Sequence, residues 1–559
     1  MRREAMGKQL KFVFVVMMVI MSLLGIWFWM KNDRKSNRLA PSPASHHNQM
    51  NSDDLHSPLT TKPMIDIGIA PQEWHQILDL LHWPGPDKPI QNLSTSTDPS
   101  NTYFYIPGLQ KSYQVGEELR VIVVARDFHQ NPKPYGGDFF QAKLYSSKLK
   151  ASVFGEVTDL QNGTYSVRFL LPWAGEAWVA VRMFHSSEAV QVLKHNRKYY
   201  SDRVYFKGIF VGMDLNGRTL RESMECNAKW DSAGLERIRK GNCCCEYPDP
   251  RAGEVWLCKR PKSLPCDALV YHTMGGYRKT LSLQEAKLMD MKYTDKWIKG
   301  NSSKIVILPS NVTVGVTEKC RPGLHIPVPS GFYMRDVWTS LVCATAHFNA
   351  PRITQCLKDR EVYMMGDSTM RQWYHYLAKS VPSMRNMNLH STEQVGPLLM
   401  VDVENNILLH WRSHGTPLRT RTAPLANLHY ISNEIDSMAG GSRKVFIFDI
   451  WAHFTSFPLE YYTRRVARIR QAVIALLKRA PDTIVIIKSA NTGSKNVFGS
   501  DWLSLQLDTL LRATFQGINV TVIDVWQMTS CHYSKENIHP NPTVIRNEID
   551  VMLSFICPV

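Results

Sequence analysis

The sequence has 559 residues, which is too long for a single hydrophobic core, and domain-size statistics favour roughly three folded units plus tails. Apolar residues make up 44% and charged residues 21%, a globular composition that excludes global disorder. The formal net charge is +17, but the basic residues are scattered and no nucleic-acid-binding motif occurs, so nucleic acid is excluded as a partner. A solvated basic surface explains the charge, and attraction to acidic glycans or anionic membranes is the alternative.

An uncharged segment near the N-terminus predicts a membrane anchor. Phe12 to Met30 carry no charge, have basic residues on both sides and are long enough to span a bilayer. The segment ends in bulky residues rather than the small ones of a signal-peptidase site. We expect a cytosolic tail at 1–11, a transmembrane signal-anchor at 12–30 and a disordered stalk at 31–64. This describes a single-pass type II membrane protein of the secretory pathway, in the Golgi or at the cell surface. Secretion after signal cleavage is the alternative.

The eleven cysteines predict disulfide bonds in a lumenal or extracellular compartment. No CxxC pair is followed by a second pair or by paired histidines at zinc spacing, so we expect no metal and no cofactor. An odd number leaves at least one thiol free or intermolecular. The disulfide candidates in the polar middle of the chain include Cys226, Cys245, Cys258 and Cys266. Glycosylation sequons that agree with a secretory route occur at Asn92, Asn162, Asn301, Asn311 and Asn519.

The pattern of apolar residues divides the folded part into three segments. Residues 65–213 contain short alternating runs separated by turns, including the hairpin signal Asn162-Gly163, and predict an Ig-like, filamin-type β-sandwich. Residues 214–348 form a Cys-rich connector to which we assign no fold, and an extension of the sandwich or a lid over the later domain are the alternatives. Residues 349–559 alternate strand-like and helical runs and predict an α/β domain with a doubly wound parallel sheet. The expected fold is therefore multi-domain, a β-sandwich followed by an α/β domain.

A serine stands at the turn between a strand and a helix. Gly366-Asp367-Ser368 follows the apolar run Val362 to Met365 and precedes a helical pattern. Such a turn exposes a hydroxyl above the carboxyl end of a sheet, where a substrate carbonyl can reach it. A serine hydroxyl requires a base, and His539 follows the last strand-like run. The pair predicts an acyl-ester enzyme.

Simpler roles exist for these residues. Ser368 could simply cap the helix that begins at Thr369, without a role in catalysis. His539, which precedes a proline, could be an ordinary turn residue. His414 and His453 are more often structural than catalytic, and Asn491 is typical of a turn.

Several motifs in order resemble the PC-esterase branch of the SGNH/GDSL hydrolases and, more closely, the neurexophilin and PC-esterase domain (NXPE) family. The resemblance covers roughly residues 65–559. The motifs that carry it are Gly366-Asp367-Ser368-Thr369 with Arg371-Gln372-Trp373-Tyr374, Phe457-Pro458, Pro481-Asp482-Thr483, Ile538-His539-Pro540 and the Asp159 to Tyr165 turn.

The resemblance implies an SGNH-type α/β domain in which Ser368 is the nucleophile and His539 the general base. The sequence departs from the SGNH pattern twice, because Glu536 replaces the usual aspartate before the base and His453 stands where an asparagine donor is expected. The expected oxyanion or substrate-binding residues are Gly366, Asp367, His414, Gly415 and Asn491.

Two functions follow from these residues. The first is an esterase or O-acyltransferase acting on a glycan or glycoprotein through an acyl-serine. The second is an inactive, neurexophilin-like secreted or cell-surface binding protein with a neurexin-like cell-surface partner. The membrane is contacted through the N-terminal anchor.

Overall fold

The computed structural model describes residues 67–86, 93–214, 216–230 and 243–558, which belong to one compact unit. The predicted tail, anchor and stalk lie outside these ranges. Within the ranges, no helix combines the length and the apolar character that crossing a bilayer requires.

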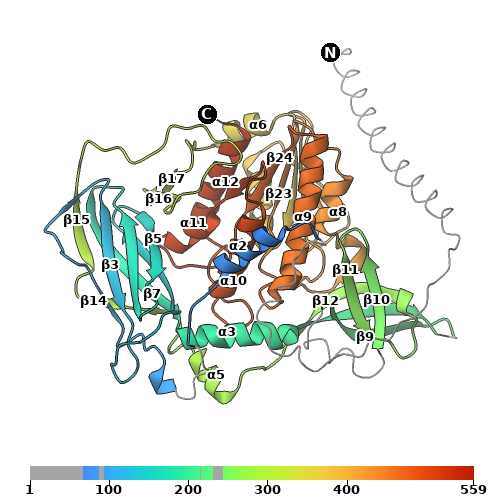
Figure 1. Cartoon of the computed structure of the whole chain (residues 1–559). Helices are drawn as coiled ribbons and strands as arrows, with labels where there is room; N and C mark the ends of the chain where they lie inside the picture. Colours follow the sequence, from blue (N-terminus) through green and yellow to red (C-terminus); the bar gives the residue numbers. More distant parts are fainter. Residues whose placement is uncertain (1–66, 87–92, 215, 231–242, 559) are drawn as a thin grey trace, which may run out of the picture. The chain divides into compact units, whose positions relative to one another are not determined.

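The N-terminal half is built on one continuous sheet (Figure 1). Its strand order is β14-β1-β3-β6-β5-β4-β7-β15-β2, with β13 on β7 and the β16–β17 hairpin on β5. Side chains from β1, near one end of this order, and from β15, near the other, share one apolar core, so the sheet curls around it. The strands are β1 (Tyr103–Tyr105), β2 (Tyr113–Gln114), β3 (Glu118–Val124), β4 (Phe139–Ser146), β5 (Ala151–Asp159), β6 (Thr164–Leu170), β7 (Gly175–His185), β13 (Lys296–Trp297), β14 (Lys299–Gly300), β15 (Lys304–Leu308), β16 (Gly331–Met334) and β17 (Val337–Ser340).

A second, antiparallel sheet has the order β10-β11-β9-β8-β12-β22. It is tied to the C-terminal half by a buried ion pair between Glu254 and Arg465, whose Oε1 and Nε lie 2.7 Å apart. Its strands are β8 (Val204–Met213), β9 (Thr219–Ala228), β10 (Cys243–Asp249), β11 (Glu254–Lys259), β12 (Leu269–Tyr277) and β22 (Ala423–Pro424).

The C-terminal sheet has the order β19-β20-β21-β18-β23-β24-β25, and its strands from β21 to β25 run parallel. They are β18 (Glu361–Gly366), β19 (Arg385–Met387), β20 (Leu398–Asp402), β21 (Ile407–Ser413), β23 (Lys444–Phe448), β24 (Ile484–Lys488) and β25 (Thr521–Ile523). Alternate residues of β23 enter opposite cores: Phe446 packs with one set of helices and Ile447 with the other. This alternation is the period of two that a strand imposes on its side chains.

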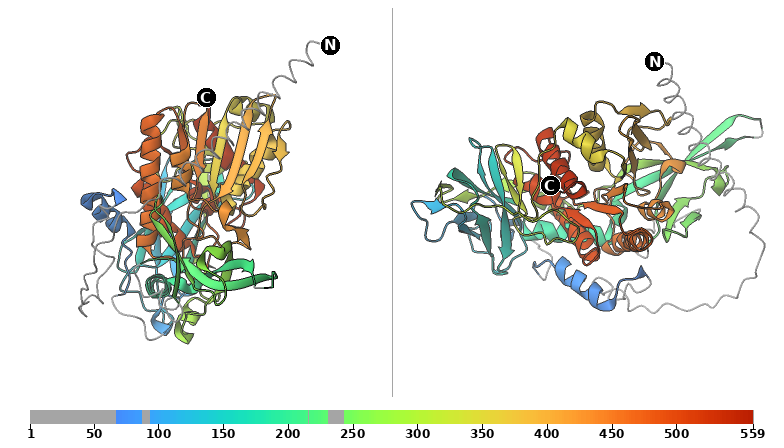
Figure 2. Two further views of the ribbon diagram at one scale, coloured as in Figure 1. Left: turned by 90° about the vertical axis from the view of Figure 1, so that its right-hand side faces the viewer. Right: turned by 90° about the horizontal axis from the view of Figure 1, so that it is seen from above.

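Helices therefore cover both faces of the C-terminal sheet (Figures 1 and 2). The helices that share the core of Phe446 include α2 (Pro71–Leu81), α8 (Ile431–Ser437), α9 (Leu459–Arg479) and α10 (Asp501–Thr514), and those that share the core of Ile447 include α6 (Ala350–Leu357), α7 (Ser368–Ser380), α11 (Val525–Cys531) and α12 (Pro542–Ile556). Two further helices, α3 (Ser187–Tyr199) and α5 (Leu283–Leu288), follow strands of the N-terminal half.

The predicted fold class is wrong. The N-terminal half is not a self-contained Ig-like sandwich, because its single sheet is completed by β13 to β17 from residues 296–340. The C-terminal sheet is mixed rather than parallel, since β19 and β20 are antiparallel, and the two halves share one compact unit instead of separate domains. An alternating strand pattern specifies which face of each strand is buried, but it does not specify the strand order. The proposed boundaries at 213/214 and 348/349 stay predictions.

Candidate functional site

The turn between β18 and α7 places Ser368 at the start of a helix. A side chain at Gly366 would lie 1.9 Å from Asp449 Oδ1, so only glycine fits between the strand and its neighbour. Asp367 is the N-cap of α7, and its carboxylate accepts a hydrogen bond from Thr369 N at 2.7 Å. The helix cap is therefore supplied by Asp367, and the hydroxyl of Ser368 is not used for it.

Ser368 and His539 meet. Ser368 Oγ and His539 Nε2 lie 2.7 Å apart although 171 residues separate them in sequence. The pKa of His539 is held below its ordinary 6.5 by burial, an effect that Arg371 reinforces and Asp367 opposes. The imidazole is therefore neutral at pH 7 and can accept the serine proton.

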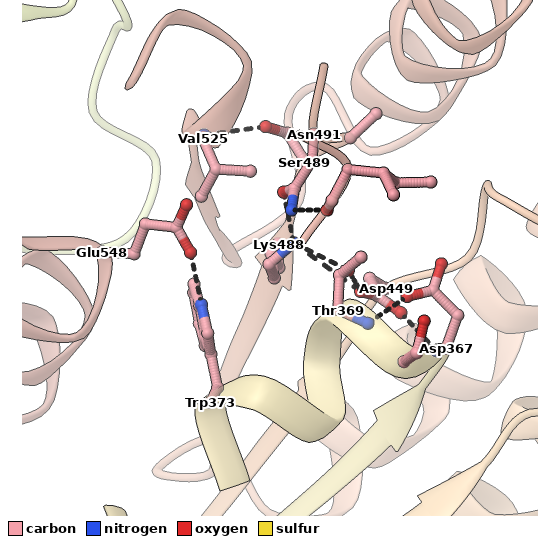
Figure 3. A network of polar contacts seen from close by, with 12 residues as sticks. Asp367, Thr369, Trp373, Asp449, Lys488, Ser489, Asn491, Val525 and Glu548 are labelled. Atoms are coloured by element: carbon pink, nitrogen blue, oxygen red, sulfur yellow. Dashed lines mark hydrogen bonds and ion pairs between the residues drawn. The ribbon is translucent and has the colours of Figure 1, made fainter. Parts of the chain in front are cut away.

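A buried polar network packs against this turn (Figure 3). Asp449 accepts hydrogen bonds from the backbone N–H of Asp367 at 2.9 Å and from the hydroxyl of Thr369 at 2.8 Å. Lys488 Nζ donates to Thr369 Oγ1 at 3.0 Å and lies 3.8 Å from Asp449 Oδ2. Burial raises the pKa of Asp449 to about 7, and the nearby Asp367 carboxylate adds to the rise while Lys488 opposes it. The network holds the first turn of α7 in place.

Asn491 links this network to the segment of the base. Its Oδ1 accepts from Lys488 Nζ at 2.7 Å, and its Nδ2 donates to the carbonyl of Ile538 at 2.9 Å. Both ends of the amide are occupied, so Asn491 positions the residue before His539 rather than facing a substrate.

Glu536 does not bind His539. Its carboxylate accepts a hydrogen bond from Arg182 of β7, and its side chain is 4% exposed. Arg182 also lies 3.2 Å from Asp295 Oδ1. Among the hydrogen bonds of the described residues, none joins Glu536 to His539, and His539 Nδ1 has no carboxylate partner. Sequence reasoning missed Arg182 because it stands in a strand of the N-terminal half, far from any motif.

A cavity of about 220 Å³ opens beside Ser368. His453 lines it, and His453 Nδ1 accepts a hydrogen bond from the backbone N–H of Arg419 at 3.3 Å. The pKa of His453 is well below its ordinary value because of burial and the nearby His414 and Arg419. In a neutral imidazole whose Nδ1 accepts, Nε2 carries the hydrogen. His453 is thus a donor on the wall of the cavity that also contains Ser368.

His414 and Gly415 lie behind this wall. Both are buried and neither lines the cavity. The ring of His414 is 4.9 Å from that of His453, and its Nδ1 lies 2.8 Å from the carbonyl of Gly415. Burial lowers the pKa of His414 to about 4. The predicted substrate-binding residues that do line the cavity are Gly366 and Asp367.

The same cavity contains polar residues that sequence reasoning missed. Arg371, Arg419 and Arg421 give it a cationic lining, and the buried hydroxyl of Ser413 has no hydrogen-bond partner within the described residues. Arg419 and Arg421 belong to a short basic run after β21, on the sheet edge where sites collect. This position after a strand was the signal from which Arg419 and Arg421 could have been predicted as site residues.

Disulfides join all four candidate cysteines, as Cys226–Cys258 and Cys245–Cys266. The other pairs found among the described residues are Cys243–Cys244, Cys320–Cys343 and Cys356–Cys557. The unpaired thiol of Cys531 is buried, which raises its pKa to about 12. Disulfides persist in oxidising compartments, so the chain is a product of the secretory pathway.

The remaining predicted positions are surface asparagines. Asn162, Asn301, Asn311 and Asn519 are exposed, as a glycan acceptor must be, and Asn92 lies outside the described residues. No cluster of metal-binding side chains occurs in the part of the chain that the structure describes.

Family models match both halves of the chain. Residues 338–557 match the model described as NXPE family member 4-like, C-terminal domain, and residues 75–293 match the model described as Neurexophilin. Among curated proteins, 80 residues are 35% identical to the Dynein alpha chain, flagellar outer arm, of Chlamydomonas reinhardtii, which is 14% of this chain and 2% of that protein's length.

Similarity to solved structures is weak. The Escherichia coli adhesin FdeC aligns with a TM-score of 0.13 and 10% identity over 38% of this chain and 65% of its own. Invasin, a bacterial integrin-binding protein, aligns with a TM-score of 0.13 and 9% identity over 57% of this chain and 60% of its own. These alignments carry no argument. The two family models follow each other in the order that the motifs predict, and the chain belongs to the neurexophilin and PC-esterase domain (NXPE) family.

Proposed function

We propose that this protein is a serine-dependent acyl esterase or O-acyltransferase that acts on a glycan or glycoprotein. The observation that supports the proposal most directly is the 2.7 Å contact between Ser368 Oγ and His539 Nε2 beside a cavity. Nucleophilic acyl transfer requires a neutral histidine within hydrogen-bond distance of a serine hydroxyl, and the hydroxyl of Ser368 is not used to cap the helix.

The chemistry uses groups already in place. His539 Nε2 takes the hydroxyl proton as Ser368 Oγ attacks the ester carbonyl, whose oxygen becomes an oxyanion. The first N–H groups of a helix have no intrahelical acceptor, so Ser368 N–H can donate to that oxyanion together with His453 Nε2. The tetrahedral intermediate then expels the alcohol, which takes the proton from His539. The acyl-serine that remains is released to water in hydrolysis or to a sugar hydroxyl in transfer.

The lining of the cavity supports an anionic substrate. Arg371, Arg419 and Arg421 surround the space next to Ser368, and guanidinium groups bind carboxylates and phosphates with paired hydrogen bonds. The space of about 220 Å³ suits a small acyl group with part of one sugar ring. An acidic sugar or a phosphate-bearing acyl donor fits this charge.

A fluorophosphonate probe tests the proposal on the purified full chain. We expect labelling of the wild-type protein, loss of labelling in Ser368→Ala and strong reduction in His539→Gln. Ser282→Ala is the matched control, because Ser282 caps α5 without a histidine partner and should leave labelling unchanged. Assays of acetyl release and acetyl transfer on sialylated and neutral glycans then separate the reactions. A cooperatively folded wild-type chain that the probe does not label would refute the proposal.

The second candidate is an inactive binding protein with a neurexin-like cell-surface partner. Two observations favour it: the match of residues 75–293 to the Neurexophilin model, and the engagement of Glu536 by Arg182 instead of His539. In that case Ser368→Ala should leave partner binding and every cellular phenotype intact.

The placement in the cell is also a proposal. Residues 12–30 would anchor the protein as type II in the Golgi or plasma membrane, with secretion after cleavage as the alternative. Release of the protein into the medium of expressing cells, with an N-terminus beyond residue 30, would contradict anchoring.

A further inference from the structure

A second cavity, of about 770 Å³, lies between the N-terminal sheet and the loop after α11. Strands β4, β7, β13 and β14 form one wall, and residues 533–536 of the loop form another. Its volume falls in the range of sites for small organic ligands. It does not depend on the chemistry proposed for Ser368.

The charge of this cavity is strongly positive. Five basic side chains line it and only two acidic ones do. Both acidic groups, Asp295 and Glu536, are paired with Arg182, and Asp295 is also paired with Lys495, which leaves Lys143, Lys299 and Lys535. The cavity therefore has cationic groups left over for an anionic ligand.

Lys143 provides the most specific of these groups. Its side chain is buried, and Nζ donates one hydrogen bond, to the carbonyl of His532 at 2.7 Å. An ammonium has three N–H donors, and no second acceptor for Lys143 occurs among the described residues. A buried ammonium with unused donors is unfavourable unless an anion completes it.

An aromatic platform stands next to this lysine. Trp297 is 54% exposed, and its ring lies 5.8 Å from Lys143 Nζ and 5.1 Å from the guanidinium of Arg182. A large exposed indole at the wall of a polar cavity offers a flat apolar surface for a ring whose other edges are polar. The apolar face of a pyranose has this shape.

We propose that this cavity binds a carboxylated sugar, with the carboxylate on Lys143 Nζ and the sugar ring against Trp297. The site is distinct from the cavity beside Ser368, since the two share no lining residue. The loop at 533–536 that borders it leads directly to His539, so the ligand contacts the segment that carries the base.

Binding of two matched sugars to the full chain tests the proposal by calorimetry. We expect methyl β-D-glucuronide to bind and methyl β-D-glucoside, which lacks the carboxylate, to bind much more weakly. Loss of the charge-assisted hydrogen bond in Lys143→Met should weaken glucuronide binding at least about tenfold. Trp297→Ala, at an exposed position, should weaken it as well.

Two controls locate the site. Lys148→Met removes an exposed lysine just after β4, and Lys358→Met removes an exposed lysine at the end of α6; both should leave glucuronide binding unchanged. The proposal is overturned by equal binding of the two sugars, by no binding at millimolar concentration, or by wild-type affinity in both Lys143→Met and Trp297→Ala.

Discussion

Asp367 caps the helix, and Ser368 is therefore available as a nucleophile at the same helix start. A serine near a helix start commonly accepts hydrogen bonds from the N–H groups of the first turn through its hydroxyl. Here the carboxylate of Asp367 accepts from Thr369 N, which leaves Ser368 Oγ for His539. The same carboxylate acts on His539 electrostatically, because its charge raises the histidine pKa against the lowering effect of burial.

The pH dependence of labelling should follow His539. The base is active when neutral, so the fluorophosphonate rate should fall at low pH with a midpoint below 6.5, the ordinary value for histidine. The positive charge of Arg371 contributes to the lowered pKa, so Arg371→Gln should move the midpoint to higher pH. Arg385→Gln, at an exposed residue of β19, is the control and should leave the midpoint in place. An unchanged midpoint in Arg371→Gln would contradict this account.

At the scale of elements, the loop from α11 to α12 is held by partners from several parts of the fold. Lys143 of β4 binds the carbonyl of His532, Arg182 of β7 binds Glu536, and Asn491 binds the carbonyl of Ile538. Two of these partners belong to the N-terminal half. The position of His539 therefore depends on strands that carry no catalytic group.

Removal of Arg182 tests this dependence. Arg182→Gln leaves Glu536 buried without its partner, and breaking such a pair costs about 3–5 kcal/mol of unfolding free energy. Labelling of Ser368 should slow as well, because the loop loses an anchor. Arg168→Gln is the matched control, since its exposed ion pairs with Glu118 and Glu156 contribute at most about 1 kcal/mol.

A double-mutant cycle measures the interaction energy between Arg182 and Glu536. The variant Arg182→Gln/Glu536→Gln should lose less unfolding free energy than the sum of the two single variants, because each single change leaves one buried charge without its partner. Additive losses in urea unfolding would show that the pair does not support the loop.

The strand-turn-helix at Ser368 could be predicted from sequence because it is local. An apolar run, a glycine and a helical pattern lie within about fifteen residues, and the structure has β18 ending at Gly366 and α7 beginning at Ser368. The pairing with His539 could be predicted from the need of a serine for a base and from the place of His539 after the last strand-like run, and the resemblance to a family agreed with it. The ion pair between Glu536 and Arg182 could not be predicted, since the two residues are 354 positions apart. Arg182 lies in β7, whereas Glu536 lies in the loop between α11 and α12.

The prediction of the fold class was wrong for a related reason. The alternating runs of residues 103–185 specify buried faces, and these are present: Val121 and Val167 face each other across β3 and β6 in the core. The strands that close the sheet come from residues 296–340, where turn residues interrupt the periodicity. Strands of two to five residues carry too few side chains to give a pattern.

At the scale of the whole molecule, the N- and C-terminal halves share buried polar contacts as well as apolar ones. Arg203, just before β8, is fully buried, and its guanidinium donates to the carbonyls of Val497 at 3.0 Å, Ser456 at 3.0 Å and Thr455 at 3.3 Å. These carbonyls lie in loops of the C-terminal half, more than 250 positions along the chain. One side chain thus satisfies backbone groups that neither half could satisfy alone.

This arrangement predicts that the two halves unfold together. Denaturant unfolding followed by tryptophan fluorescence and by far-UV circular dichroism should give one coincident transition. Arg203→Met should shift this single transition to lower denaturant concentration without splitting it. The free energy of unfolding should fall by about 3–5 kcal/mol, because several buried carbonyls lose their hydrogen-bond donor at once. Arg120→Met is the control: Arg120 is exposed on β3 and its side chain donates a hydrogen bond to Ser166 Oγ, so its removal should change the free energy of unfolding by less than about 1 kcal/mol. Two separate transitions, of which Arg203→Met moves one, would show instead that the halves are independent domains and that the guanidinium contributes to only one of them.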